Sequence, residues 1–337
     1  MRVEKARGLG NAALGQRPAI GTNSSGVFDC LLVGHKRSAD AVPCFIRIKG
    51  NPYEDAPTFT ALIQTFKDPP IQAQQLVQRL RKIPIPKEIV VNDDSQGAQS
   101  AIWLPLLTGR NEFYVASPNL HEVRSYNRLA QMARGELLVF VQGDTCLPSS
   151  PQWMLDAVHL IRALPNLAML SGRAGFDAVL NYQMDSNTRD ALTWGSAPYK
   201  SLDHVVPSED TRDLIPFTFA PGVDNGPLIY RRDALLRVGG FDESYSCAPG
   251  HLSGHYDFEL SLRFWIRGWQ VGVFYGGATN GIGGRKTIRG PLRKMERHKN
   301  ELWNGRRVEA LWGAHNATIT RRLAESTRLL APLPRQL

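Results

Sequence analysis

The chain has 337 residues, of which 42% are hydrophobic and 21% charged, and its formal net charge is +9. This composition is typical of a soluble globular protein with one large or two medium domains, and excludes a fibrous or low-complexity chain. It contains no apolar run of about 18 residues and no apolar N-terminal segment of signal-peptide length. We therefore expect no transmembrane helix and no signal peptide, and a location in the cytoplasm or at a membrane surface.

Positive charge is concentrated in two parts of the chain. Residues 285–307 carry nine Lys and Arg against two Asp and Glu, and residues 1–50 carry eight against three. A basic segment beside a nearly neutral remainder indicates an anionic partner, which could be a phosphate-bearing ligand, a nucleic acid or a membrane. Composition does not choose among these three.

The first half of the chain alternates between strand-like and helix-like patterns. Residues 1–56 are rich in Gly, Ala, Ser and Asn and predict a mostly irregular arm. From residue 58 on, strands are predicted at "TFTALIQTF", "KEIVVNDDS", "EFYVAS", "ELLVFVQGD" and "AMLSGRAGF". Helices are predicted between them at "KDPPIQAQQLVQRLRKI", "EVRSYNRLAQMARG", closed by Gly135, and "QWMLDAVHLIRAL". This alternation predicts parallel strands joined by crossover helices.

The second half is less regular. Residues 176–225 are polar with scattered aromatics, and predict a long excursion over the ligand edge of the sheet. Regular patterns resume at "GPLIYRRDALLRVGGFDES", followed by a helix at "DFELSLRFWIRG" and a strand at "WQVGVFY". From about Pro291 the chain reads as a basic helix.

We therefore expect three parts. They are an N-terminal arm (1–56), a main domain (57–290) with a first half to about 150 and a second half from about 151, and a C-terminal helical tail (291–337).

Two predicted strands end in polar, acidic tips: residues 92–94 (Asn-Asp-Asp) and 142–144 (Gln-Gly-Asp). Ligands bind at the carboxyl ends of parallel strands in open α/β sheets. A carboxylate at a rigid strand end can hold Mg²⁺ or Mn²⁺, which prefer oxygen ligands. Glycine beside it lets a ribose or phosphate approach the backbone. Without further context, simple turn chemistry explains both tips equally well.

The order of these segments resembles that of family 2 glycosyltransferases, over roughly residues 58–275. "EIVVNDDS" resembles the strand of that family that ends in paired acids and serine, and "EVRSYNRLAQMARGELLVFVQGD" its Arg-x-x-Asn helix and metal-binding strand end. "GPLIYRRDALLRVGGFDE" and "YDFELSLRFWIRGWQV" resemble its acceptor and catalytic-base segments. The resemblance implies the GT-A fold, a Rossmann-like, mostly parallel sheet flanked by helices, here with an irregular N-terminal arm and a basic helical tail.

The resemblance also implies a nucleotide-binding half. Asp93 would recognise the base and ribose of the nucleotide, and a carboxylate there favours uridine. Thr65 would line the same pocket with backbone groups, and Arg124 would lie near the nucleotide or its phosphates. Gly143 would let the ribose or phosphate come close to the backbone. Asp144 would be the ligand of Mn²⁺ or Mg²⁺, which neutralises the departing diphosphate.

The chain departs from the family pattern at two positions. The family usually has an acid where this chain has Gln142, and often another where it has Tyr256. Glutamine forms hydrogen bonds but carries no charge. Metal binding is therefore expected to be weaker or to depend more on the oxygens of the diphosphate. The substitution Gln142→Asp is expected to preserve or tighten metal binding.

Asp257 matches the catalytic base of the family. It would take the proton of the acceptor hydroxyl as that oxygen attacks the anomeric carbon from the face opposite the diphosphate, which inverts the anomeric centre. Its position at a helix start favours the ionised carboxylate. Glu259 is spaced to pair with Arg263 and is expected to be structural.

The glycine-rich segment "GGATNGIGGRKTIRG" carries Arg285, Lys286 and Arg289, which would bind the phosphate oxygens. His298 is a candidate third metal ligand or phosphate contact, although a histidine on a basic helix is more often solvated.

Three functions remain open at this point. The first is an inverting, metal-dependent, non-processive glycosyltransferase with a UDP-sugar donor and a glycan, protein or small-molecule acceptor. The second is a nucleotide-sugar-binding homologue that has lost catalysis, suggested by the two departures. The third is a nucleic-acid-binding protein that uses its basic ends, which no recognised motif supports.

Overall fold

The structure is a computed structural model. It describes residues 27–29, 45–48, 57–66, 70–172, 175–176, 204–207, 214–223, 227–246, 254–277, 279–280 and 291–332.

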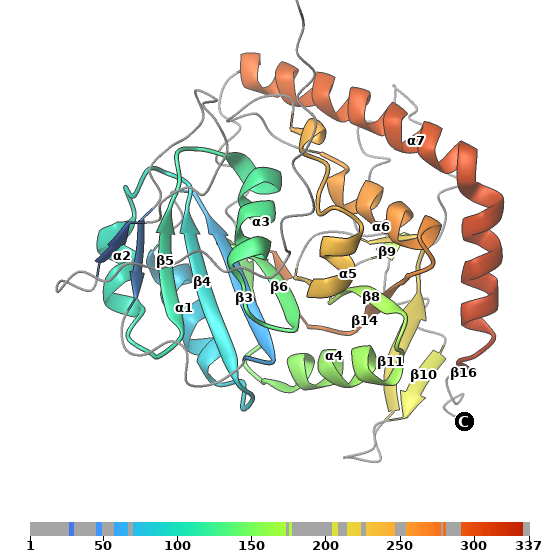
Figure 1. Cartoon of the computed structure of the whole chain (residues 1–337), viewed down its shortest axis with the longest axis horizontal. Coiled ribbons are helices and arrows are strands. Elements are labelled where there is room, and N and C mark those ends of the chain that lie inside the picture. The colour runs from blue at the N-terminus through green and yellow to red at the C-terminus, as the bar shows by residue number, and fades with distance from the viewer. Residues whose placement is uncertain are drawn as a thin grey trace, which may run out of the picture.

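The first half of the main domain consists of alternating strands and helices, and the sequence predicts all of them except the short helix at Ser100–Leu106 (Figure 1). The strands are β3 (Phe59–Thr65), β4 (Lys87–Asp93), β5 (Glu112–Ala116) and β6 (Leu137–Gln142). The connecting helices are α1 (Pro70–Arg81), α2 (Ser100–Leu106) and α3 (His121–Met132). α1 begins at a proline, whose missing N–H costs nothing at a helix start, and buries Leu76 and Leu80 as its periodicity predicts.

The second half continues the sheet with shorter connections. Its helices are α4 (Gln152–Ala163), α5 (Arg232–Arg237), the 3₁₀ turn η3 (Glu243–Tyr245), α6 (Tyr256–Ile266) and α7 (Pro291–Thr327). Its longer strands are β8 (Leu167–Ser171), β10 (His204–Pro207), β11 (Leu214–Phe219), β13 (Leu228–Arg231) and β14 (Gln270–Phe274). Two-residue strands are β7 (Thr145–Cys146), β9 (Gly175–Phe176), β12 (Gly222–Val223), β15 (Thr279–Asn280) and β16 (Ala331–Pro332).

Most of these strands join one sheet with the order β1-β2-β5-β4-β3-β6-β13-β8-β14-β11-β10-β16. β5, β4, β3 and β6 run parallel, and β8 and β14 run the same way beyond β13, which is antiparallel to both of its neighbours. The strands at the two edges are antiparallel. This arrangement confirms the predicted α/β fold class, with a Rossmann-like central sheet flanked by helices.

Buried side chains continue through the sheet from one half to the other. β3 is buried along its whole length, as expected of a strand covered on both faces. A cluster of aromatic rings joins α3 to the second half. The ring centroid of Tyr126 lies 4.7 Å from that of Phe140 and 5.7 Å from that of Phe241. The ring centroid of Phe241 lies 5.8 Å from that of Tyr256. Such edge and tilted contacts add packing energy to simple area burial. The two halves therefore share one core.

The structure forms strands within two regions that the sequence predicts to be irregular, and the second of these expectations is corrected. Part of the N-terminal arm is regular, because β1 (Val27–Asp29) and β2 (Phe45–Ile48) extend the sheet beyond β5. Part of the predicted excursion at residues 176–225 is also regular, since β10 and β11 form an antiparallel pair beside β14. β11 alternates between buried and more exposed residues, the pattern of an antiparallel strand with one solvated face.

The basic tail forms the predicted helix. α7 runs along the outside of the molecule against α6 (Figure 1). Asn304 is buried and donates to the carbonyls of Tyr245 (2.9 Å) and Gly254 (3.1 Å), and Arg322 donates to the carbonyls of Trp265 and Ile266 at the end of α6. Within the described part of the chain, no helix has the length and apolar character needed to span a membrane.

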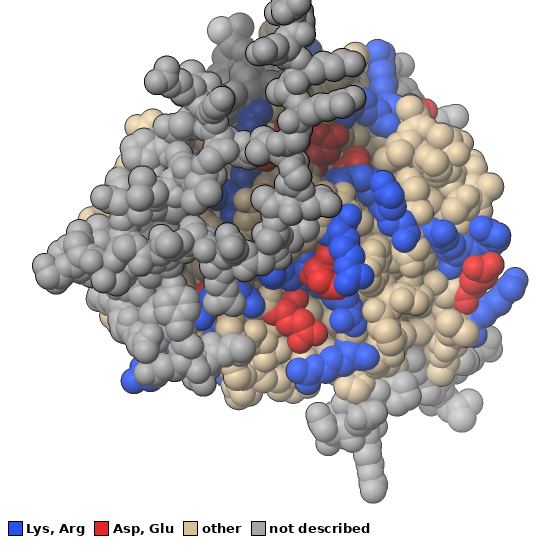
Figure 2. Space-filling model, viewed as in Figure 1, with Lys and Arg blue, Asp and Glu red and all other residues tan. Residues whose placement is uncertain are grey.

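Charges of both signs share the surface. Figure 2 shows Lys and Arg beside Asp and Glu across the visible face. Arg307 of α7, for example, donates to Asp242 at 3.0 Å and lies over the ring of Tyr245. Part of the positive charge of the tail is therefore paired within the fold.

Gly135 has a different role from the one expected. α3 ends at Met132 with Ala133 as its C-cap, so Gly135 does not close the helix. It passes the backbone of β3 instead: a Cβ at this position would lie 2.4 Å from the amide nitrogen of Thr60. Close approach to another backbone is the reason for glycine here.

We predict opposite effects for the same substitution at two glycines. Gly135→Ala should lower the free energy of unfolding by about 1–3 kcal/mol, because the new methyl group meets a backbone that cannot yield. Gly313→Ala should raise it by about 0.5–1 kcal/mol, because nothing lies within 4 Å of that position in α7 and alanine favours helix. Urea unfolding of both variants measures the signs. Equal effects would contradict the close approach at Gly135.

Candidate functional site

The register of three parallel strands brings the predicted site residues together at one edge of the sheet. Thr65 pairs with Asp93, and Gln64 pairs with Asn92 on one side and Gln142 on the other. Because these strands run the same way, their carboxyl ends meet at one edge. α3 begins at this edge after β5, and α6 begins there before it leads back into β14.

Asp93 holds the loop that follows β4. Its carboxylate is fully buried and accepts hydrogen bonds from the backbone N–H (2.9 Å) and hydroxyl (2.5 Å) of Ser95, the N–H of Gln99 (2.8 Å) and the hydroxyl of Tyr114 (2.7 Å). Burial, followed by the hydrogen bond to Asp93, raises the pKa of Tyr114, so the phenol remains a donor. Four internal donors make Asp93 an anchor of this edge, and its expected contact with a nucleotide remains a prediction.

Thr65 lies in the same network. Its hydroxyl donates to the side-chain oxygen of Gln99 at 2.9 Å, and its carbonyl accepts from the N–H of Asp94 at 3.0 Å. β3 and the loop after β4 are therefore fixed to each other at the strand ends.

Asp94 is a site-edge residue to which the sequence analysis gave no role. Its carboxylate accepts from the hydroxyl of Ser117 (2.6 Å) and from the N–H groups of Leu120 and His121 (2.7 Å each), where α3 begins. Burial raises the pKa of Asp94, and these hydrogen bonds oppose that shift. An acid that caps a helix 27 residues away has no local signal in the sequence.

Gln142 and Tyr256, the two departures from the family pattern, share one partner. The amide Nε2 of Gln142 donates to Glu122 Oε1 at 2.8 Å, and the hydroxyl of Tyr256 donates to Glu122 Oε2 at 3.1 Å. The next residue along β6, Gly143, donates its N–H to the carbonyl of Gln64 at 2.7 Å. Glu122 therefore connects the end of β6 with the start of α6, a role that the sequence analysis missed.

Asp144 is buried in the turn after β6. Beside it, β7 pairs with β15, the strand that leads into residues 281–290. Arg285, Lys286 and Arg289 fall within that segment, outside the described residues, so their predicted phosphate contacts remain predictions. His298 is exposed on α7.

A divalent metal at this edge of the sheet would need oxygen ligands. Among the described residues, no group of three or more His, Cys, Asp and Glu is placed to hold a metal ion. Mg²⁺ and Mn²⁺ sites for nucleotide substrates require only one or two carboxylates, because phosphate and water supply the other ligands. A single buried carboxylate at Asp144 fits such a site.

Asp257 occupies the first turn of α6 and is 6% exposed. Its Oδ1 accepts the N–H of Phe258 at 2.9 Å, and its carbonyl accepts the hydroxyl of Ser261 at 2.7 Å. Burial and then the charge of Asp257 raise the pKa of Tyr230. The helix start favours the ionised form of this acid.

Two other candidates have defined partners. Glu259 pairs with Arg263 through two contacts of 2.5 and 2.8 Å, which confirms the expected structural pair. Arg124 lies 3.6 Å from Glu243 of η3, so it contacts the second half of the domain. Its predicted contact with the nucleotide remains a prediction.

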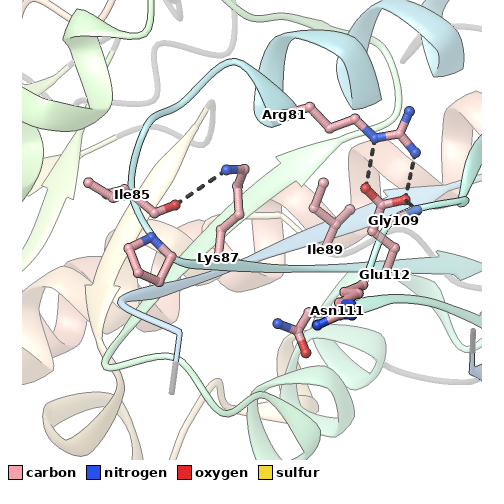
Figure 3. Close-up of a pocket in the computed structure, with 9 residues that line it drawn as sticks. Arg81, Ile85, Lys87, Ile89, Gly109, Asn111 and Glu112 are labelled. Atoms are coloured by element: carbon pink, nitrogen blue, oxygen red, sulfur yellow. Dashed lines mark hydrogen bonds and ion pairs between the residues drawn. The ribbon is translucent and has the colours of Figure 1, made fainter. Parts of the chain in front are cut away.

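A separate cavity of about 290 Å³ lies at the opposite edge, where β4 and β5 begin (Figure 3). Arg81 binds Glu112 through two hydrogen bonds of 2.8 and 2.6 Å, and Lys87 donates to the carbonyls of Ile83 (2.6 Å) and Ile85 (3.3 Å). These cations are engaged by the protein itself. These contacts hold the chain segments before β4 and β5 in place. None of the predicted site residues lines this cavity.

Comparisons with known proteins give structural likenesses only. No family model matches the chain, and no curated protein matches it. A crystal structure of GalNAc-T7 with UDP, GalNAc and Mn²⁺ aligns with 66% of this chain and 43% of its own, at 13% identity and a TM-score of 0.45. A crystal structure of S. aureus TarS aligns with 64% of this chain and 35% of its own, at 16% identity and a TM-score of 0.42. A TarS fragment in complex with UDP-GlcNAc aligns with 64% of this chain and 55% of its own, at 16% identity and a TM-score of 0.41.

In each case the chain spans less than two thirds of the matched structure.

His255, which precedes α6, makes the stability of this edge sensitive to acid. It is buried in a left-handed backbone conformation (φ 63°), and burial lowers its pKa below the ordinary 6.5, against the opposing influence of Glu301. The unfolded chain therefore binds a proton more readily than the folded chain does. The stabilising effect of a neutral His255 is present above pH 6.5 and is lost as the pH falls below it.

We predict that His255→Asn reduces the loss of unfolding free energy between pH 7 and pH 5. Asparagine tolerates the left-handed conformation, so the fold is kept. Urea unfolding at a series of pH values measures the slope, with His315→Asn on α7 as the control. A His255→Asn variant with the parental slope would contradict this assignment.

Proposed function

We propose that this chain is a GT-A glycosyltransferase that moves a sugar from a nucleotide sugar to an acceptor hydroxyl with inversion at the anomeric carbon. The observation that carries the proposal is the meeting of three parallel strand ends with the first turn of α6 at one edge of the sheet. That edge holds the acids that the family 2 resemblance assigns to nucleotide, metal and base, namely Asp93, Asp144 and Asp257.

The nucleotide would bind across the ends of β3, β4 and β6. The loop after β4 and the start of α3 are fixed by Asp93 and Asp94, so the edge is formed before the ligand arrives. Thr65 would line this pocket, and Gly143, which has no side chain, would let the ribose or phosphate come close to the backbone. A carboxylate such as Asp93 beside the nucleobase favours uridine, so the sugar donor would be a UDP-sugar.

The diphosphate would lie beside Asp144. This carboxylate would hold Mn²⁺ or Mg²⁺, which supplies positive charge to the departing diphosphate. Arg285, Lys286 and Arg289 follow β15, which pairs next to Asp144, and they would bind the phosphate oxygens.

Asp257 would act as the base. It accepts the proton of the acceptor hydroxyl while that oxygen bonds to the anomeric carbon. The bond from this carbon to the phosphate oxygen breaks, and its electron pair leaves with the nucleoside diphosphate. Attack opposite the leaving group inverts the configuration of the sugar.

We predict that the donor site depends on Asp144. Mn²⁺ with UDP should raise the melting temperature of the parent, because a ligand that binds only the folded state stabilises it. Asp144→Asn should lose this stabilisation while unfolding at the parental temperature without ligand. Asp233→Asn, an exposed acid in the first turn of α5, serves as the control. An Asp144→Asn variant that responds to Mn²⁺ and UDP like the parent would remove Asp144 from the metal site.

We predict that Asp257→Asn binds a UDP-sugar but loses turnover by about 10²- to 10⁴-fold, the usual contribution of a positioned base. Calorimetry measures binding, and release of UDP from a panel of UDP-sugars measures turnover. The coupling constant of the anomeric proton gives the configuration of the product. A product that retains the donor configuration would refute the inverting mechanism, and a parent that binds without turnover would identify the binding homologue instead.

A further inference from the structure

Glu122 uses both carboxylate oxygens to join two separate elements at the candidate site. Oε1 accepts from Gln142, the last residue of β6, and Oε2 accepts from Tyr256, the first residue of α6. Asp144 follows Gln142 by two residues, and Asp257 follows Tyr256 directly. One side chain thus connects the strand end of the metal ligand with the helix start of the base.

Both donors suit a carboxylate. The Nε2 group of Gln142 can only donate, and burial followed by the charge of Glu122 raises the pKa of Tyr256, so its phenol keeps its proton. Hydrogen bonds to an ionised acceptor are stronger than those between neutral groups. Both hydrogen bonds of the bridge therefore have a fixed direction, with Glu122 as the acceptor.

The rest of α3 is anchored independently of this bridge. Asn127 donates its Nδ2 to the carbonyl of Phe241 at 2.9 Å and accepts the N–H of the same residue at 2.8 Å. Tyr126 packs on Phe140 and Phe241. Loss of the Glu122 contacts should leave the helix in place and release only the end that faces the site.

We propose that Glu122 is a positioning residue that sets the placement of Asp257 relative to Asp144. The proposal rests on the proposed function, because it assigns the donor side of the site to one half of the domain and the base to the other. Reactions of this kind are sensitive to such placement, since a misplacement of about 1 Å can cost about 10²-fold in rate.

The bridge also accounts for the amide at position 142. A glutamate there would face Glu122 at hydrogen-bond distance, and an aspartate, which is one methylene shorter, would still bring a second negative charge close to it; like charges so placed repel each other. The expectation that Gln142→Asp preserves or tightens metal binding stays a prediction. An acid at position 142 should disturb the bridge.

The test compares Glu122→Ala with Glu122→Gln. Glutamine can keep both hydrogen bonds, because its oxygen accepts from Gln142 and its amide donates to the hydroxyl of Tyr256. We expect Glu122→Ala to lower kcat for hydrolysis of UDP-glucose or UDP-GlcNAc by about 10- to 100-fold, with KM within about threefold of the parent. Glu122→Gln should recover kcat to within about fivefold of the parent.

Two further variants sharpen the result. Tyr256→Phe removes one of the two hydrogen bonds and should lower kcat by an intermediate factor, without adding to the defect of Glu122→Ala in the double variant. Asp233→Asn removes another acid from the first turn of a helix, and should leave kcat unchanged.

Several outcomes would overturn the proposal. They are a Glu122→Ala variant with parental kcat, a Glu122→Gln variant as slow as Glu122→Ala, and additive effects of Glu122→Ala and Tyr256→Phe. If Glu122→Ala does not fold, Tyr256→Phe with parental kcat overturns it. A parent that hydrolyses no member of a panel of UDP-sugars, which includes UDP-glucose and UDP-GlcNAc, overturns the proposed function, and this role with it. An active parent with an unaffected Glu122→Ala variant overturns this role alone.

Discussion

The site depends on the backbone pairing of three buried parallel strands. Every N–H and C=O group in β4, β3 and β6 must find a partner, because water cannot reach them. The register of these strands aligns Asp93 with Thr65 and Gln64 with Gln142. Parallel strands with this alignment end at one edge, so their polar tips meet there. A slip of one residue would turn every buried side chain to the other face.

Buried acids then make this edge rigid. Asp93 holds the loop after β4, and Asp94 holds the start of α3, each by hydrogen bonds to backbone N–H groups. A satisfied buried network fixes one geometry, whereas a partly satisfied one is costly. Transferases gain from such order, because groups that are already aligned need no reorganisation during the reaction.

The two halves of the domain meet through α3. Its first turn contacts β6 and α6 through Glu122, and its middle contacts the second half through Asn127 and the aromatic cluster. α7 supports α6 from the other side through Asn304 and Arg322. The first turn of α6, which carries Asp257, is thus held between elements that are distant in sequence. Part of the positive charge of α7 therefore helps to hold this helix against α6, in addition to any role in binding an anionic partner.

The sequence by itself determined the four parallel strands of the first half, the helices α1 and α3, the acids at the strand ends and the pair of Glu259 with Arg263. Each of these follows from periodicity or from neighbours a few residues apart. The tertiary structure alone decided the strands in the arm, the close approach of Gly135 and the partner of Gln142. Glu122 lies 20 residues from Gln142 and 134 residues from Tyr256. Contacts over such separations leave no local pattern, because only the packing of the folded chain brings the side chains together.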